Sequence, residues 1–192
     1  FGVIAQILYV GAQIMCWTYI YQYAEAISID AVTAGYYQII AFILFIIGRA
    51  IGTYLLKHTN PGKLLLYFAI LSIALIQGTI FITGIVGLYA LVGVSFFMSI
   101  MFPTIYGIAL SDLTEEQSKI GSAGLVMAIV GGALMPKLQG LIIDTGGNGV
   151  ADIKIVGVSE VNFSFTLPLI CFLFIAWYGL KVFRNASQKN NV

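Results

Sequence analysis

The sequence predicts an all-α integral membrane protein with six transmembrane helices. Hydrophobic residue types make up 60% of its 192 residues and charged types only 9%, whereas an ordinary soluble domain carries about 25% charged residues. The mean hydropathy is +0.99. Six segments are apolar and long enough to cross a hydrocarbon core of roughly 30 Å. Helices are expected for them because lipid offers no partner to unpaired backbone groups.

The predicted helices occupy residues 1–24, 31–56, 64–83, 85–110, 120–143 and 161–184, and they form one domain over residues 1–192. Polar stretches separate them. The segment 58–63, HTNPGK, predicts a tight turn before the third helix. Thr114 and Gln117 have the spacing of a capping box for the fifth helix. Residues 144–160 contain GGNG and form the longest predicted loop.

Basic residues predict how the helices are oriented in the membrane. One side of the predicted bundle holds Arg49, Lys57, Lys63, Lys119, Lys181, Arg184 and Lys189. The opposite side holds only Lys137 and Lys154. Because loops rich in Lys and Arg stay in the cytoplasm, both ends of this chain are predicted to be cytoplasmic. The formal net charge is +1, which gives no indication of nucleic-acid binding.

The first helix carries a row of polar and aromatic side chains. Tyr9, Gln13, Trp17 and Tyr21 are spaced four apart, so we expect them on one face. An amide near the helix midpoint is costly against lipid, so Gln13 is expected to face a neighbouring helix or a water-filled cavity. Aromatic faces beside an amide suit a sugar. The alternative is that the tyrosines are interface residues and Gln13 joins helices.

The fourth helix contains a proline near its middle. Pro103 has no N–H, so the carbonyl of Ser99 loses its helical donor and needs another one. Met98, Phe102 and Tyr106 share one face beside this point. A kinked helix lined in this way fits a gate or the wall of a binding site, with Met101 next to it. The alternative is a static bend.

Apart from Lys181 and Arg184 in the last turn of the sixth helix, two charges lie inside predicted crossings. Lys137 follows Pro136, a second candidate kink in the fifth helix, and intramembrane charges are candidates for function. Lys137 is also close enough to the outer surface to reach the interface. Arg49 is the second residue of GRAIG, residues 48–52, just before the cytoplasmic turn. We expect it to latch the cytoplasmic side, unless it serves only as a topology charge.

No crossing contains a carboxylate or an imidazole. The acidic residues fall in loops or at helix edges: Glu25, Asp30, Asp112, Glu115, Glu116, Asp144, Asp152 and Glu160. His58 also lies in a loop. A proton-coupling group would therefore lie outside this chain. Ser122 has no intramembrane base, and neither Cys16 nor Cys171 has a second ligand nearby in sequence. We predict no enzyme, no metal and no cofactor.

Four stretches carry a resemblance that covers nearly the whole chain: YVGAQIMCWTYIYQYA (9–24), GRAIGTYLLKHTNPGKLL (48–65), FFMSIMFPTIYGIAL (96–110) and GSAGLVMAIVGGALMPKLQGLIID (121–144). The chain resembles the C-terminal six-helix half of the fucose/galactose/glucose branch of the major facilitator superfamily. The resemblance implies one half of a twelve-helix fold. It places Gln13, Trp17 and Phe102 at the central cavity, with Tyr9, Met101 and Tyr106 as further predicted sugar contacts.

The resemblance also implies a function. It predicts import of a monosaccharide together with protons, with L-fucose as the expected sugar, by rocking of two halves about a central site. The expected partners are the lipid bilayer and the N-terminal six helices of the same transporter, in a bacterial inner membrane. The alternative is a six-helix protein that dimerises as a scaffold or as a carrier for something other than sugar. The missing intramembrane acids favour the half-transporter.

Overall fold

The computed structural model describes residues 1–111, 113–147 and 149–189. Its α-helices are α1 (Gly2–Thr18), α2 (Ile20–Ala26), α3 (Ala31–Leu56), α4 (Pro61–Phe81), α5 (Ile85–Met98), α6 (Met101–Leu110), α7 (Glu115–Met127), α8 (Gly131–Ile143), α9 (Glu160–Ser164) and α10 (Thr166–Lys189). Short 3₁₀ helices, η1 (Ala128–Val130) and η2 (Asp144–Gly146), adjoin α8. The strands β1 (Lys154–Ile155) and β2 (Val158–Ser159) pair antiparallel in the long loop.

These helices make six membrane-length crossings. Five spans are apolar and long enough by themselves, and α1 with α2 completes a sixth that bends by 41°. The predicted all-α membrane fold is therefore confirmed. Four crossings are interrupted: α1 to α2 at Tyr19, α5 to α6 at Ser99 and Ile100, α7 to α8 at η1, and α9 to α10 at Phe165.

Local capping sets two helix starts earlier than hydropathy predicts. The Asn60 side chain accepts hydrogen bonds from the backbone of Gly62 and Lys63, and Pro61 occupies the first helical turn, so α4 begins inside the expected turn. The expected capping box is present, because the Thr114 hydroxyl and the Gln117 side chain each bond the other's backbone. The fifth crossing thus begins at Glu115.

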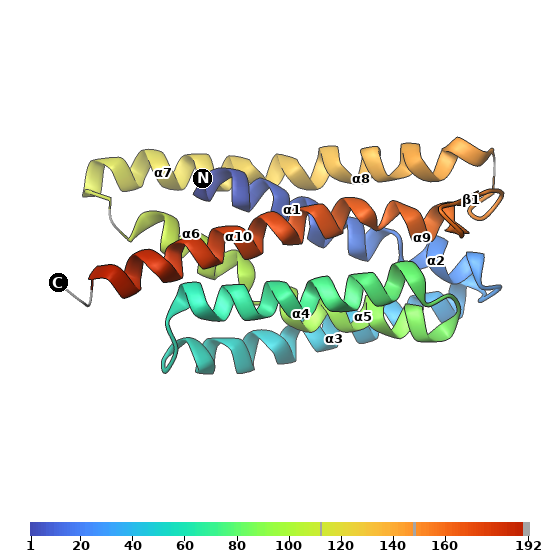
Figure 1. Cartoon of the computed structure of the whole chain (residues 1–192), viewed down its shortest axis with the longest axis horizontal. Helices are drawn as coiled ribbons and strands as arrows, with labels where there is room; N and C mark the ends of the chain where they lie inside the picture. Colours follow the sequence, from blue (N-terminus) through green and yellow to red (C-terminus); the bar gives the residue numbers. More distant parts are fainter. Residues whose placement is uncertain (112, 148, 190–192) are drawn as a thin grey trace.

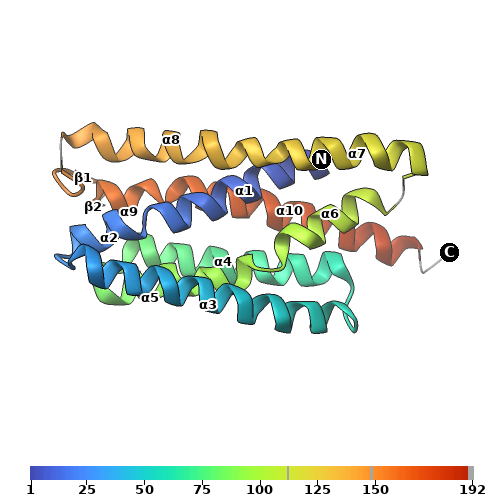
Figure 2. The ribbon, with the colours of Figure 1, turned by 180° about the vertical axis from the view of Figure 1, so that it is seen from behind.

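The crossings pack side by side in one bundle. The views in Figure 1 and Figure 2 place α7 and α8 in a row along one side and α3, α4 and α5 on the other, with α1 and α10 between them. The contacting pairs include α4 with α10 and α5, α1 with α8 and α10, and α3 with α5. The buried core lies between these pairs, and it includes Tyr23, Leu65, Leu88, Phe165 and Phe172.

Candidate functional site

Three of the predicted site residues form one aromatic row across α1 and α6. The Phe102 ring meets Tyr9 edge-on at 6.2 Å between ring centroids. It stacks on Tyr106 at 6.5 Å, with an interplanar angle of 12°. Phe102 and Tyr106 are half-buried, whereas Tyr9 is completely buried. Phe102 and Tyr106 thus present ring surface beside the Pro103 kink, with Tyr9 supporting them from behind.

The structure does not leave every predicted residue open to a ligand. Met101 has no exposed surface, so it is a core residue here and not part of a wall. The row in α1 also does not stay on one face. A spacing of four residues turns about 400°, so three steps drift by about 120°, and the bend at Tyr19 adds to this. Tyr9 is consequently buried, while Tyr21 is 43% exposed.

Gln13 and Trp17 lie between these extremes and are half-buried. The Trp17 indole N–H donates to the Ser95 hydroxyl of α5 at 3.2 Å. Its ring is met edge-on by Phe42 and Phe45 of α3, at 4.9 and 5.1 Å between centroids. Within the described part of the chain, the Gln13 amide makes no side-chain hydrogen bond, so it keeps its hydrogen-bonding capacity for another group.

The break in the fourth crossing is satisfied by side chains from two other helices. Both Nε and Nη2 of Arg49 donate to the Ser99 carbonyl, at 3.1 and 2.8 Å. The Tyr9 hydroxyl donates to the Met98 carbonyl at 2.9 Å. The expectation that the carbonyl orphaned by Pro103 needs an outside donor therefore agrees with the geometry, and Arg49 is that donor.

Close glycine contacts bring α3 to this break. A side chain on Gly48 would overlap the Phe96 carbonyl oxygen, and a Cβ on Gly52 would lie 2.9 Å from Ile100. The GRAIG stretch is therefore a close-approach motif of the small-xxx-small type. It sets Arg49 against the broken helix. No acidic partner of Arg49 appears among the described residues. Its observed partner is the carbonyl of Ser99, the C-cap residue of α5, and the expected role of Arg49 as a cytoplasmic latch stays a prediction.

The fifth crossing has its own irregularity. Pro136 lies inside α8, and its carbonyl accepts a hydrogen bond from the Tyr19 hydroxyl at 2.6 Å. The same contact joins the bend of the first crossing to the proline position of the fifth. Lys137, the next residue, is exposed. The ion pair between Lys119 and Glu115 is the one salt bridge in the described segments, and it does not involve Lys137.

A polar network that the sequence did not point to joins the other ends of three crossings, at α2, α4 and α9. Asn162 is 3% exposed, and its amide nitrogen donates to the Thr79 carbonyl at 2.8 Å and the Tyr23 hydroxyl at 3.3 Å. Tyr23 in turn donates to the Ile82 carbonyl at 3.2 Å. These carbonyls end α4, where helical donors run out. An Asn at the start of an apolar segment was the only available signal.

Among the described residues, the acidic side chains lie in loops or near helix ends, as expected. One of them, Glu160, is also buried. Glu160 begins α9 and is fully buried, and it accepts a hydrogen bond from the Asp152 backbone at 2.8 Å. Asp112 lies outside the described residues. Cys16 and Cys171 are free and buried.

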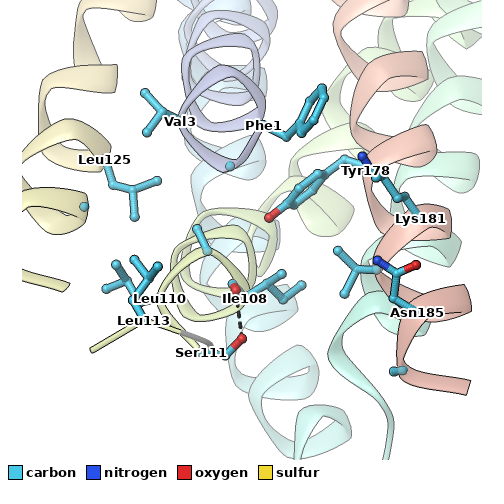
Figure 3. A pocket seen from close by; sticks show the side chains of 15 residues that line it. Phe1, Val3, Ile108, Leu110, Ser111, Leu113, Leu125, Tyr178, Lys181 and Asn185 are labelled. Carbon is cyan, nitrogen blue, oxygen red and sulfur yellow. Dashed lines mark hydrogen bonds between the residues drawn. The ribbon is translucent and has the colours of Figure 1, made fainter. Parts of the chain in front are cut away.

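A hollow of about 590 Å³ opens at one end of the bundle, lined by Phe1, Ile108, Leu125, Tyr178 and Lys181 among others. Figure 3 shows these side chains around the start of α1, the end of α6 and α10. None of the predicted sugar contacts lines it. This is expected of a site built between two halves, because one half alone presents only an open wall.

Comparisons with known proteins show which proteins this chain is similar to. No protein-family model matches the chain. It is 54% identical to the L-fucose-proton symporter of Haemophilus influenzae over 95% of its length and 36% identical to that of Escherichia coli over 98%. The chain is a relative of the L-fucose–proton symporters. It is also 30% identical to the glucose/galactose transporter of Brucella abortus, over 93% of its length.

A solved structure has the same fold as this chain. The crystal structure of the major facilitator superfamily transporter FucP in the outward conformation matches 94% of the chain, with a TM-score of 0.83 and 33% identity. The chain spans about two-fifths of the curated relatives, 41% and 40% of their lengths. It thus has the fold of one half of a major facilitator transporter. These relatives are named as transporters, which agrees with the prediction that the chain is not an enzyme.

Proposed function

We propose that this chain forms the C-terminal half of a proton-coupled sugar symporter that imports L-fucose by alternating access. The 54% identity to a named L-fucose-proton symporter, over 95% of this chain, carries the proposal. The open aromatic wall beside a broken helix supports it, because sugars bind between the halves of such transporters near broken helices. The alternative of a dimeric scaffold has no comparable support.

The proposed sugar contacts come from the first and fourth crossings. Gln13 supplies the free amide and Trp17 the aromatic face on α1, while Phe102 and Tyr106 form the opposite wall on α6. Tyr9 supports this wall through its hydrogen bond to the Met98 carbonyl. The kink at Pro103 lets the wall move as the two halves rock.

L-Fucose is proposed over galactose and glucose. The 54% identity to a fucose symporter exceeds the 30% identity to the glucose/galactose transporter. The proton-carrying carboxylate is assigned to the other half, because α1 to α10 place no acid in the middle of a described crossing. The membrane is proposed to be the bacterial inner membrane, with both ends of this chain cytoplasmic as the basic residues predict.

Uptake by the full-length transporter tests this function. Bacterial cells without their own L-fucose uptake would express it and receive labelled L-fucose, alone or with excess D-galactose or D-glucose. We expect saturable uptake that a protonophore abolishes and that unlabelled L-fucose suppresses more strongly than either hexose. Uptake that survives the protonophore would contradict proton coupling. Equal suppression by D-galactose would contradict the assignment of the sugar.

A further inference from the structure

We propose that Arg49 is a positioning residue for transport, which holds the break of the fourth crossing by binding the carbonyl that Pro103 leaves without a helical donor. The proposal rests on the proposed symport, since the sugar wall at Phe102 and Tyr106 begins just beyond this break. Arg49 touches no proposed sugar contact through its hydrogen bonds. It acts on the site through the backbone of Ser99.

The need for this contact follows from the sequence of the broken helix. In an unbroken helix, the N–H of residue 103 would donate to the Ser99 carbonyl, and proline removes that donor. Ser99 is completely buried, so water is not freely available to replace it. An unpaired carbonyl in this setting costs free energy comparable to a lost hydrogen bond. Some side chain therefore has to reach it.

The arginine side chain is suited to this carbonyl. Two N–H groups of the same guanidinium converge on the one oxygen, at 3.1 and 2.8 Å. The guanidinium also lies over the Phe45 ring, 5.1 Å from its centroid. A planar fork held on an aromatic ring is preorganised, whereas a lysine ammonium is a flexible point charge. The fit favours a specific ligand over a topology charge, which needs no directed partner.

The helix that carries Arg49 is built to deliver it. Gly48 and Gly52 allow α3 to touch the backbone and side chains of the break itself, at Phe96 and Ile100. Arg49 remains exposed overall, despite its contacts with the Ser99 carbonyl and the Phe45 ring. Because proline leaves no intrahelical donor to this carbonyl, the side chain is its ligand, and a side chain can release the carbonyl and bind it again. The break is therefore adjustable, and α3 controls it.

A double-mutant cycle between Arg49 and Pro103 tests the proposal directly. Pro103→Ala restores an N–H that can donate to the Ser99 carbonyl, so the arginine becomes redundant there. In the full-length transporter we expect Arg49→Gln to lower the maximal rate of L-fucose uptake by about tenfold, with KM changed by less than about threefold. In the Pro103→Ala background the same change should cost less than about threefold.

Controls and the opposite outcome are defined by the same cycle. Arg49→Lys should fall between wild type and Arg49→Gln, because an ammonium keeps the charge but loses the fork. Arg184→Gln, at the exposed end of α10, should leave uptake unchanged in both backgrounds. An equal fold-loss from Arg49→Gln with and without Pro103 would overturn the proposal, since it would show no coupling through the Ser99 carbonyl.

The thermal stability of the purified protein, measured without sugar, gives a second readout. We expect Arg49→Gln to lower the melting temperature, and Pro103→Ala to reduce that loss. If Arg49→Gln fails to accumulate in the membrane, recovery of the double variant would support the proposal, and absence of both would overturn it. If the wild-type protein imports no sugar, only the proposed symport is refuted. The stability cycle would still test the contact between Arg49 and the Ser99 carbonyl.

Discussion

The helices α3 and α4 are equally apolar but packed very differently. Both have a mean hydropathy of 2.2 over their most apolar window, yet 17% of that window is buried in α3 and 44% in α4. α4 packs between α5 and α10, and its Gly62 lies against the backbone of α10. α3 touches the bundle through a narrow line of small buried residues, Ala34, Ala41, Gly48 and Gly52, and through the rings of Phe42 and Phe45 on Trp17. Hydropathy therefore indicates that a helix lies in the membrane, whereas small residues and hydrogen bonds determine which neighbours it packs against.

The largest expected effect is the loss of the α3 contact line. Gly48→Ala should destabilise the full-length protein by about 3 kcal/mol or more, because the new Cβ would overlap the Phe96 carbonyl and lie 2.7 Å from the Ser99 hydroxyl. Thermal unfolding in detergent measures this. Gly35→Ala is the matched control on the same helix, since its Cβ would meet only the Tyr21 hydroxyl at 3.5 Å. Similar losses for both would contradict the contact line.

The next largest effect is expected at Trp17 of α1, whose ring packs on Phe42 and Phe45 of α3. Trp17→Ala should weaken L-fucose binding at least about tenfold, or about 1.4 kcal/mol, through loss of the ring surface. Trp177→Ala is the control, because that indole is 45% exposed and packs on Phe1 and Phe174 instead. Equilibrium binding to the full-length protein gives both values. If the two variants bind equally well, Trp17 does not contact the sugar.

On α4, the decisive contact is a hydrogen bond from outside the helix. Asn162→Ala should cost about 1–2 kcal/mol of stability, because it leaves the Thr79 carbonyl without a donor in a buried position. Asn185→Ala, at an exposed position of α10, should change stability little. Thermal unfolding of the two variants compares them, and equal melting temperatures would remove Asn162 from the account of α4.

A smaller effect is expected where α3 meets the break. Pro103→Ala should slow L-fucose turnover a few-fold, roughly 0.5–1 kcal/mol in activation free energy, and should weaken binding less. The added N–H competes with Arg49 for the Ser99 carbonyl and stiffens the kink. Uptake rates and binding constants of the same preparation separate the two effects. Unchanged turnover would make the proline a static bend.

The smallest expected effect is on the pH dependence of stability, in which the N-caps of α3 and α4 differ. The Asp30 carboxylate caps α3 by accepting from the Thr33 hydroxyl and backbone, and these hydrogen bonds lower the pKa of Asp30 below its ordinary value. The cap therefore contributes above the unfolded pKa and fades as pH falls through the folded one. α4 is capped by Asn60, which does not titrate. Asp30→Asn should remove a slight acid-dependent loss of stability, whereas Asn60→Ser should not alter its pH dependence. Identical pH profiles for Asp30→Asn and wild type would contradict this.

The fold could be predicted from the sequence because hydropathy, polar turns and the Thr114 cap act locally. The need of the Ser99 carbonyl for an outside donor was also predictable, since proline chemistry is local. The identity of that donor was not, because Arg49 reaches it across 50 positions of the sequence. Burial of Met101 and Tyr9 likewise depends on how much each helix is rotated toward its neighbours. Asn162 acquires its role only when the ends of α2, α4 and α9 meet.

Proton movement driven by the sugar tests the central claim most directly. The full-length protein would be reconstituted in proteoliposomes without a pH gradient, and the external pH would be followed after a pulse of L-fucose. We expect the external pH to rise as protons enter with the sugar, a protonophore to abolish this rise, and D-glucose to give a smaller one. Entry of labelled L-fucose with no change in external pH would contradict proton-coupled symport.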